Sequence, residues 1–483
     1  PQWFISMESH GLRDKALKAI DKTKFFPNKG KERLKSMIEL RPDWCVSRQR
    51  VWGVPIPVFM SKKTNEALVD DEVTNNIANI FEKEGADCWF EGDTQKFLGK
   101  KYKSQDYEKQ TDIVEVWFDS GSTHAYVLEK REDLKWPASM YLEGSDQHRG
   151  WFHSSLLESC GTRGRAPFDS ILSHGFVVDG KGLKMSKSLG NIMSPEDILK
   201  KYGADILRIW VAASDYSEDL RIDYSILDQH AESYRKIRNT FRYLLGNLND
   251  KFVKIDFEKI NIKELPELEQ YMLHKIFNLN TLFKKYFNDY NFHTLYKELL
   301  HFCTLDLSAF YFDIRKDTLY CDAIESQKRK SCIKFLNIVF EILLKWFAPI
   351  LSFTTEEIYS LTKIESNNSI HLEKFPEIPL NWKNKDLEAK WNQLIKIRDK
   401  CNSSIEIKRA SKEIGSSLEV NLTINLNDKL MGIAKEVDFS ELCITSGAKI
   451  KKLEKTNLEE IIIETNKAEG KKCPVCWKIT EAE

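Results

Sequence analysis

A glycine-rich stretch with three lysines is the first place where this sequence offers chemistry. Residues 180–191 read GKGLKMSKSLGN and follow the apolar run ILSHGFVVD, so Lys181, Lys184 and Lys187 lie on a flexible connection after an expected strand. Lysines on a mobile loop can close over phosphate oxygens as negative charge develops and then withdraw. A solvated turn whose lysines have no role is the alternative interpretation.

A second stretch gathers acids at the end of another expected strand. It reads YLEGSDQHRGWFHSS from residue 141, with Glu143 and Asp146 on either side of Gly144. Carboxylates in this position can bind an ammonium group or ribose hydroxyls, and the glycine lets a ligand approach the backbone. The alternative is that Asp146 only caps an ordinary helix.

Two further patterns suggest a pocket and a metal site. RPDWCVSRQRVWGVPIPVF and EVWFDSG bring together four aromatic residues that can line an apolar pocket or simply fill a core: Trp44, Trp52, Trp117 and Phe118. CPVCWK contains Cys473 and Cys476, which would supply half of a tetrahedral thiolate zinc site. A redox pair or two idle thiols are the alternatives, and the charged surroundings make a redox pair the weaker one.

The elements that must position these residues alternate between strand and helix from about 136 to 212. This order predicts parallel strands, whose ligands bind beyond the carboxyl ends. We expect the loops after 142 and after 179 to lie at that same edge. Ser194, Pro195 and Asp197 have the types and spacing that begin a helix, which we expect to run through 212.

The remainder of the chain divides by pattern. Short strands are expected near both ends of residues 1–60, a polar inserted segment near 61–112, helices over 230–361, one helix over about 385–411, and a half-buried strand from Leu418 to Leu426. We therefore predict an α/β domain over 1–229, a helical domain over 230–365, a linker over 366–384 and a small α+β region over 385–483.

Composition limits the class of protein. The 483 residues are 42% hydrophobic and 30% charged, and 73 basic residues balance 73 acidic ones, so any polyanionic partner needs local basic patches. Ten scattered cysteines favour a reducing, cytoplasmic location. The most apolar stretch, 332–350, carries one polar stripe, which predicts a core helix with a wet edge and no membrane partner: Lys334, Asn337, Glu341 and Lys345.

Together these stretches resemble the isoleucyl-tRNA synthetases of class I. The matching segments occur in the family's order and are RPDWCVSRQRVWG (41–53), VWFDSGSTH (116–124), EGSDQHRGWF (143–152), KMSKS (184–188), YGADILRIWVA (202–212) and CPVCW (473–477). The resemblance implies the C-terminal half of a Rossmann-like class I catalytic core, a helical anticodon-binding domain and an α+β region. It also implies that L-isoleucine is activated with ATP and Mg²⁺ and transferred to tRNA(Ile).

The resemblance also implies individual roles. Lys184 and Lys187 would be catalytic, and Trp117 and Trp151 would line the amino-acid pocket. Cys473 and Cys476 would hold structural Zn²⁺ with two further cysteines. The ATP and adenylate would be bound by a larger set: Glu143, Gly144, Asp146, Gln147, His174 and Lys187.

The sequence also departs from the family pattern. It contains no His-Ile-Gly-His-type segment, begins without Met and stops soon after its cysteine pair. We therefore expect a part of a longer, monomeric protein, inactive by itself. A valyl or leucyl enzyme and a non-catalytic RNA-binding protein remain alternatives. Basic residues that could contact tRNA, or form only a solvated face, are Arg235, Lys236, Arg238, Arg242, Arg398, Lys400, Lys408, Arg409 and Lys412.

Overall fold

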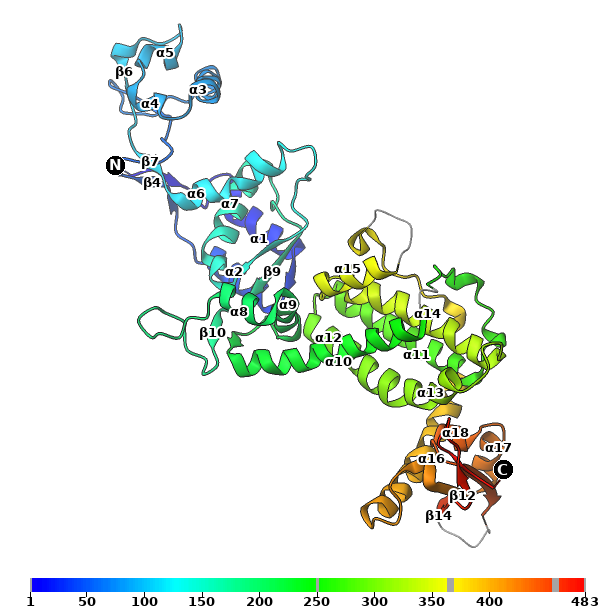
Figure 1. The fold of residues 1–483 in the computed structure, drawn as a ribbon. Helices are drawn as coiled ribbons and strands as arrows, with labels where there is room; N and C mark the ends of the chain where they lie inside the picture. Colours follow the sequence, from blue (N-terminus) through cyan, green and yellow to red (C-terminus); the bar gives the residue numbers. More distant parts are fainter. Residues whose placement is uncertain (1, 249–251, 363–368, 454–459, 482–483) are drawn as a thin grey trace. The chain divides into compact units, whose positions relative to one another are not determined.

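The computed structural model describes residues 2–248, 252–362, 369–453 and 460–481 (Figure 1). The chain forms two compact units. The first comprises Pro1–Val178 with Tyr216–Arg221, and the second comprises Asp179–Asp215 with Ile222–Glu483. In the part of the chain that is described, no helix combines the length and apolarity that crossing a bilayer would need. The boundaries expected at 229, 365 and 384 stay predictions.

A parallel three-stranded sheet forms the centre of the first unit. Strands β2 (Lys24–Phe26), β9 (Ser170–His174) and β8 (Tyr141–Gly144) lie in that order, and both neighbouring pairs are parallel. The first four residues of β9 are buried, as a central strand covered on both faces requires. The sheet confirms the parallel arrangement predicted from the alternation of strand and helix.

Three helices pack on this sheet and supply most of the apolar core. They are α1 (Leu12–Lys22), α2 (Lys29–Glu39) and α7 (Trp151–Arg163). In α1 the buried side chains recur at helical spacing, which places them on one face. The core that joins helices and sheet includes Leu12, Ala16, Ile20, Leu34, Ile38, Phe152, Leu156, Phe168 and Ile171.

The predicted inserted segment has a small core of its own. It contains α3 (Asp71–Glu84) and the antiparallel pair β5 (Phe59–Ser61) and β6 (Tyr107–Lys109). Its remaining helices are α4 (Cys88–Glu91) and α5 (Thr94–Leu98). The rings of Trp89 and Phe97 meet edge to face with centroids 5.0 Å apart in the middle of this core. Two short antiparallel pairs complete the first unit: β1 (Phe4–Ile5) with β3 (Trp44–Cys45), and β4 (Ser47–Arg48) with β7 (Ile113–Val114).

The loop after 179 does not leave the parallel sheet, contrary to the prediction. The apolar run divides into β9 and β10 (Val177–Asp179), and β10 pairs instead with β11 (Leu220–Ile222). The break falls at Gly175, where a Cβ would lie 2.2 Å from the carbonyl oxygen of Glu218. Only glycine permits this close approach of the two backbones at the point where the chain leaves the sheet.

The helix expected to run through 212 is in fact two helices. Helix α8 (Pro195–Tyr202) ends before Gly203, and α9 (Ala204–Ala213) begins after it. Gly203 has φ +82°, which a residue within an α-helix cannot adopt. The predicted start of α8 is confirmed, because the Ser194 side chain accepts a hydrogen bond from the Glu196 N–H at 3.2 Å.

A bundle of long helices follows, as the sequence predicted (Figure 1). A π-helical stretch, Phe302–Phe312, joins two of its helices directly. The helices are α10 (Tyr224–Leu248), α11 (Glu267–Asn288), α12 (Phe292–His301), α13 (Asp313–Tyr320), α14 (Gln327–Phe347) and α15 (Ser352–Leu361).

The wet edge expected on α14 is largely covered. Asn337 is only 6% exposed, and its side-chain nitrogen donates to the carbonyl oxygen of Val253 at 2.6 Å. Glu341 and Lys345 form an ion pair at 2.9 Å. Lys334 alone of the four predicted residues is exposed. The prediction that this segment is a core helix is nevertheless confirmed.

The second unit ends in the predicted α+β region. Helix α16 (Lys385–Ala410) precedes a sheet whose central strand, β12 (Val420–Leu426), alternates between buried and less buried residues. β12 pairs in parallel with β13 (Gly447–Lys452) and antiparallel with β14 (Ile461–Lys467). Two short helices and a final hairpin complete it: α17 (Asp428–Ala434), α18 (Phe439–Leu442), β15 (Lys471–Lys472) and β16 (Ile479–Thr480).

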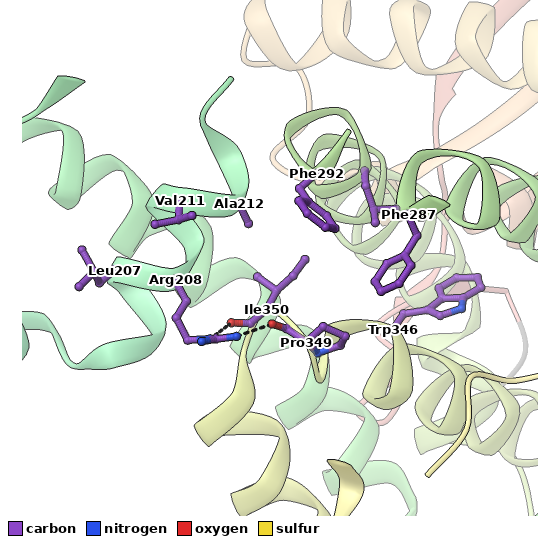
Figure 2. A pocket seen from close by; sticks show the side chains of 10 residues that line it. Leu207, Arg208, Val211, Ala212, Phe287, Phe292, Trp346, Pro349 and Ile350 are labelled. Atoms are coloured by element: carbon purple, nitrogen blue, oxygen red, sulfur yellow. Dashed lines mark hydrogen bonds between the residues drawn. The ribbon is translucent and has the colours of Figure 1, made fainter. Parts of the chain in front are cut away.

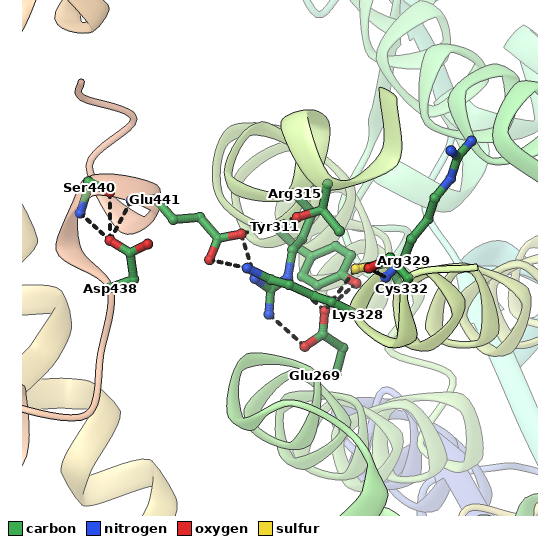
Figure 3. Close-up of polar contacts among 11 residues, drawn as sticks. Glu269, Tyr311, Arg315, Lys328, Arg329, Cys332, Asp438, Ser440 and Glu441 are labelled. Atoms are coloured by element: carbon green, nitrogen blue, oxygen red, sulfur yellow. Dashed lines mark hydrogen bonds and ion pairs between the residues drawn. The ribbon is translucent and has the colours of Figure 1, made fainter. Parts of the chain in front are cut away.

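A buried ion pair and its neighbours connect this region to the bundle (Figure 3). Glu269 of α11 is fully buried, and its carboxylate accepts two hydrogen bonds from the Arg315 guanidinium, each at 2.8 Å. Glu441 of α18 accepts from Arg315 at 2.8 Å and from Lys328 at 2.7 Å. The bundle and the α+β region therefore share charged contacts in addition to one continuous apolar core.

Candidate functional site

The carboxyl ends of β8 and β9 bring four of the predicted site residues together. Gly144 is the register partner of His174, so these two residues lie side by side where the strands end. A Cβ on Gly144 would lie 2.6 Å from Oδ1 of Asp146, which shows how closely that carboxylate approaches the backbone. Glu143 and Asp146 are both exposed at this edge, where they can accept hydrogen bonds from a ligand.

Gln147 connects the acidic edge to the predicted pocket residues. Its Nε2 donates to Asp146 Oδ2 at 3.2 Å, and its Oε1 accepts from the Trp151 N–H at 3.0 Å. At Gly150 a Cβ would lie 2.5 Å from that same oxygen and 2.9 Å from the ring of Trp117. Only glycine fits here, so Gly150 allows both side chains to pack against its backbone.

Two contacts fix the indole ring of Trp151, one on the face of the ring and one at its nitrogen. Its ring stacks on that of Tyr141 with centroids 4.0 Å apart and planes 2° from parallel. Its Nε1 donates to the carbonyl oxygen of Ser120 at 2.9 Å, in α6 (Val116–Gly121).

The four predicted aromatic residues form two groups. Trp44, which is 5% exposed, lies in the core with its ring centroid 5.9 Å from that of Phe118. Trp52, which is 89% exposed, instead lines a cavity with Trp117.

Glu158 is a buried acid that the sequence did not single out. It lies two turns after Trp151 on α7, and Oε1 has no hydrogen-bond partner among the described residues. Burial, with the charge of Asp119 as a further cause, raises the pKa of Glu158 to about 9. The carboxyl group is therefore protonated at neutral pH. The segment WFHSSLLESC carries no pattern that could have identified this acid, because its properties come from burial in the folded unit.

Asp179 and Asn191, which the sequence analysis did not single out, hold together the two ends of the loop 180–191, called the lysine loop below. Asp179 accepts hydrogen bonds from the Lys181 N–H at 3.0 Å, the Leu183 N–H at 2.8 Å and the Asn191 side chain at 2.8 Å. These contacts, the one from Asn191 first, lower the pKa of Asp179. Asn191 in turn accepts from the Ser186 N–H at 2.9 Å. Such Asx contacts at both ends of a glycine-rich loop were the available sequence signal.

Lys184 and Lys187 lie on the part of this loop beyond its closed base. Both side chains are exposed, and no ion pair in the described part of the chain involves either of them. Gly182 and Gly190, with φ +84° and +63°, allow the backbone to turn on either side of the lysines. The two lysines belong to the second unit, whereas the predicted residues of the β8–β9 edge belong to the first.

Cys473 and Cys476 lie in the turn between β15 and β16. The Cys473 N–H donates to the Lys478 carbonyl at 2.8 Å, and the Trp477 N–H donates to the Cys473 carbonyl at 3.0 Å. Backbone N–H groups of Cys476, Val475 and Trp477 lower the pKa of the Cys473 thiol. This turn favours a thiolate and fits half of a zinc site. Within the described residues, no group of three or more His, Cys, Asp or Glu side chains could hold a metal ion.

Some of the basic residues predicted to contact tRNA form hydrogen bonds or ion pairs within the protein, and the others are exposed. On α16, Arg398 donates to the Leu442 carbonyl at 2.9 Å, and Lys408 pairs with Glu413 at 2.6 Å. Arg235 and Arg409 each pair with a glutamate on their own helix. Arg398 is thus a structural residue. The remaining candidates are exposed: Lys236, Arg238, Arg242, Lys400 and Lys412.

An apolar cavity of about 410 Å³ lies in the second unit where α9 meets the bundle (Figure 2). Val211 and Ala212 of α9 face Phe287, Phe292 and Ile350 across it. At its edge the Arg208 guanidinium donates to the carbonyl oxygens of Pro349 at 2.6 Å and Ile350 at 3.0 Å. Helix α9, which follows the lysine loop, is thereby attached to the end of α14.

Two family models match the chain. Residues 1–223 match the model described as tRNA synthetases class I (I, L, M and V), and residues 269–424 match the anticodon-binding domain of tRNA ligase. The chain therefore belongs to the class I tRNA synthetase family. The predicted order of a class I catalytic core followed by an anticodon-binding domain is confirmed.

Its relatives narrow the similarity further. An isoleucine–tRNA ligase of Pelagibacter ubique is 72% identical over 483 residues, which are 100% of this chain and 53% of that protein. The isoleucine–tRNA ligase of Mesorhizobium japonicum is 49% identical over 453 residues, covering 92% of this chain and 45% of that protein. The predicted resemblance to the isoleucyl-tRNA synthetases is confirmed. The chain spans about half the length of these curated relatives.

Solved structures of other synthetases share the fold. A ternary complex of an Agrobacterium radiobacter LeuRS with tRNA and LeuAMS matches with a TM-score of 0.52 at 18% identity, over 71% of this chain and 43% of that one. Methionyl-tRNA synthetase of Mycobacterium tuberculosis, in complex with methionyl-adenylate, matches with a TM-score of 0.51 at 15% identity, over 75% and 67%. At these identities the likeness concerns the fold.

Proposed function

We propose that this chain is part of an isoleucine–tRNA ligase. The whole protein would activate L-isoleucine with ATP to isoleucyl-adenylate and transfer the acyl group to the 3′ end of tRNA(Ile). The observation that carries the proposal is the edge of β8 and β9. Two exposed carboxylates, a glycine and a histidine lie there, close to Trp151, in a chain 72% identical to a protein of that name.

The acidic edge would hold the two polar ends of the adenylate. Glu143 and Asp146 can accept hydrogen bonds from the ammonium group of the amino acid and from ribose hydroxyls. Gly144 leaves the backbone open for a nucleotide, and Gln147 keeps the Asp146 carboxylate in place through its hydrogen bond. Trp117 and Trp151 would form the apolar wall for the isoleucine side chain.

Lys184 and Lys187 would act on the phosphates. In activation, an oxygen of the isoleucine carboxylate forms a bond to the α-phosphorus, and the bond from that phosphorus to the bridging oxygen of pyrophosphate breaks. Negative charge gathers on pyrophosphate, and exposed ammonium groups on a loop can follow that charge. They would share the neutralisation with Mg²⁺ carried by the triphosphate oxygens.

Asp179 and Asn191 would define how the loop moves. Their hydrogen bonds close the base of the loop, so the segment with the two lysines can swing without unravelling. The exposed basic residues of α10 would contact tRNA phosphates, and Cys473 with Cys476 would supply two of four zinc ligands. We further propose a monomeric, cytoplasmic protein.

The test uses a full-length protein that contains this chain. We expect pyrophosphate exchange driven by isoleucine far better than by valine or leucine, and no exchange by the 483 residues alone. Lys187→Ala should lower kcat for exchange roughly 10²–10³-fold, because it removes one charge stabilising the transition state. Lys181→Ala on the same loop is the matched control and should change kcat only slightly. Unchanged exchange in Lys187→Ala would refute the catalytic role.

A further inference from the structure

Two buried hydroxyl groups connect strand β8 to the end of α6 by way of α7. The Ser155 hydroxyl of α7 donates to the carbonyl oxygen of Gly121 at 2.9 Å, and the Tyr141 hydroxyl lies 3.0 Å from the same Ser155 oxygen. Because Ser155 has one proton and gives it to a carbonyl, Tyr141 must be the donor to Ser155. Burial raises the pKa of Tyr141 to about 12, so its hydroxyl keeps that proton. Ser155 is fully buried and Tyr141 is 4% exposed, which shields both hydrogen bonds from water.

Trp151 makes a second connection between the same three elements. Its ring stacks on that of Tyr141 in β8, and its Nε1 donates to the Ser120 carbonyl in α6. Side chains of α7 therefore bind the carbonyl oxygens of Ser120 and Gly121, the last two residues of α6. At Gly121 a Cβ would lie 2.2 Å from Oε1 of Glu158, so only glycine allows α6 to approach α7 this closely.

These contacts determine where Trp117 lies. Trp117 is one helical turn before Gly121 on α6, and its ring packs against the backbone of Gly150, the residue directly before Trp151. Helix α6 has only six residues, and a helix of that length is not stable without tertiary contacts. The position of Trp117 relative to Trp151 therefore depends on the hydrogen bonds that attach α6 to α7.

We propose that Ser155 and Tyr141 are positioning residues that set the width of the amino-acid pocket and thereby its preference for isoleucine over a smaller side chain. The inference rests on the proposed function, in which Trp117 and Trp151 form the wall for the isoleucine side chain. An apolar wall favours the larger of two side chains only through contact with its additional methylene group. Without the Ser155 hydroxyl, α6 keeps the hydrogen bond from Trp151 but loses the one at Gly121, and Trp117 can move away from the bound side chain.

The experiment compares Ser155→Ala with Ser159→Ala in a full-length protein that contains this chain. Ser159 provides the matched control, because it is also fully buried on α7 and its hydroxyl donates to a carbonyl outside α6, that of Arg165, at 2.7 Å. Thermal unfolding should show similar losses of stability for the two variants. In pyrophosphate exchange, Ser155→Ala should raise KM for isoleucine about tenfold, as the loss of one buried hydrogen bond predicts, and leave kcat and KM for ATP nearly unchanged. Ser159→Ala should change none of the three.

The choice between isoleucine and valine gives a second readout. The ratio of kcat/KM for isoleucine to that for valine should fall by up to about fourfold in Ser155→Ala, which is the value of one buried methylene group. Tyr141→Phe keeps the stacked ring and removes only the hydroxyl, and it should lower the ratio in the same direction. The two effects should not add in the double variant, because both hydroxyls act through the Gly121 carbonyl.

Three results would overturn the inference: equal KM values for isoleucine in Ser155→Ala and Ser159→Ala, a KM for ATP that rises as much as that for isoleucine, or an unchanged ratio in Tyr141→Phe. A failure of the proposed function would look different. The unaltered protein would then exchange pyrophosphate no better with isoleucine than with valine.

Discussion

At the scale of single residues, Glu158 gives the clearest dependence on pH. The folded protein holds its carboxyl proton up to a pKa of about 9, whereas the unfolded chain releases it near 4.5. The contribution of Glu158 to the free energy of unfolding should therefore be fully present below pH 4.5 and decrease as pH rises toward 9, by at most about 1.4 kcal/mol per pH unit.

Glu158→Gln should remove this slope, because glutamine has nearly the shape of the protonated acid and cannot ionise. Urea unfolding of both proteins between pH 5 and pH 8 measures the difference. Glu82→Gln changes an exposed residue of α3 and is the control. Equal slopes for the wild type and Glu158→Gln would contradict the assignment of a buried, protonated acid.

Single residues show what sequence patterns can and cannot reveal. Glu143, Asp146 and Gln147 could be found because they follow an expected strand, where ligands bind. Glu158 and His153 could not, because their properties come from burial and from neighbours distant in sequence. Arg41, for example, is 112 residues from His153 in sequence, yet its guanidinium lies 3.4 Å from the His153 ring and contributes to lowering the pKa of that ring. The roles of the site residues remain predictions.

At the scale of secondary structure, Gly203 determines a helix boundary. Its φ of +82° lies where only glycine is relaxed, although a Cβ there would meet no neighbouring atom. Gly203→Ala should therefore destabilise the protein by about 1 kcal/mol through backbone strain alone.

Gly246→Ala is the matched control, for which we expect no loss of stability. Gly246 lies within α10, has no positive φ, and also has no atom within 4 Å of an added Cβ. The substitution should be neutral or stabilise by up to about 1 kcal/mol, because alanine favours the helix. Denaturant unfolding compares the two variants, and equal effects would contradict the argument from φ.

Elements with a strong period were predictable, and elements ended by contacts were not. The helices of the bundle, α16 and β12 follow from their apolar spacing. The division of α8 from α9 depends on the positive φ of Gly203, and the division of β9 from β10 falls at Gly175, where the backbone of Glu218 approaches closely. Glycine in a helical pattern is often tolerated, so sequence alone did not identify Gly203 as a boundary.

At the scale of the whole molecule, the second unit depends on one buried ion pair. Glu269→Gln should lower the free energy of unfolding by about 3–5 kcal/mol, because it leaves the Arg315 guanidinium short of a charged partner in the interior. Glu232→Gln removes the partner of exposed Arg235 and should cost roughly 0–1 kcal/mol. Equal losses in thermal and denaturant unfolding would show that burial does not matter here.

The order of the parts was predictable from sequence, whereas their attachments were not. The hydrophobic pattern predicts the change from alternating strands and helices to helices alone, and then to an α+β region. The contacts of Glu441 with Arg315 and Lys328 join residues more than a hundred positions apart. Such charged contacts carry no periodic signal.

The contacts of α9 have a mechanical consequence. The Asp205 carboxylate accepts hydrogen bonds from the N–H of Thr354 at 2.7 Å and from the Thr354 hydroxyl at 2.6 Å. The Arg208 guanidinium donates to the carbonyl oxygens of Pro349 and Ile350, which directly follow α14. Two oppositely charged side chains, one helical turn apart, thus clamp the junction between α14 and α15. A rotation of that junction should therefore move α9 with it, and α9 is connected through Gly203 and α8 to the segment that carries Lys184 and Lys187.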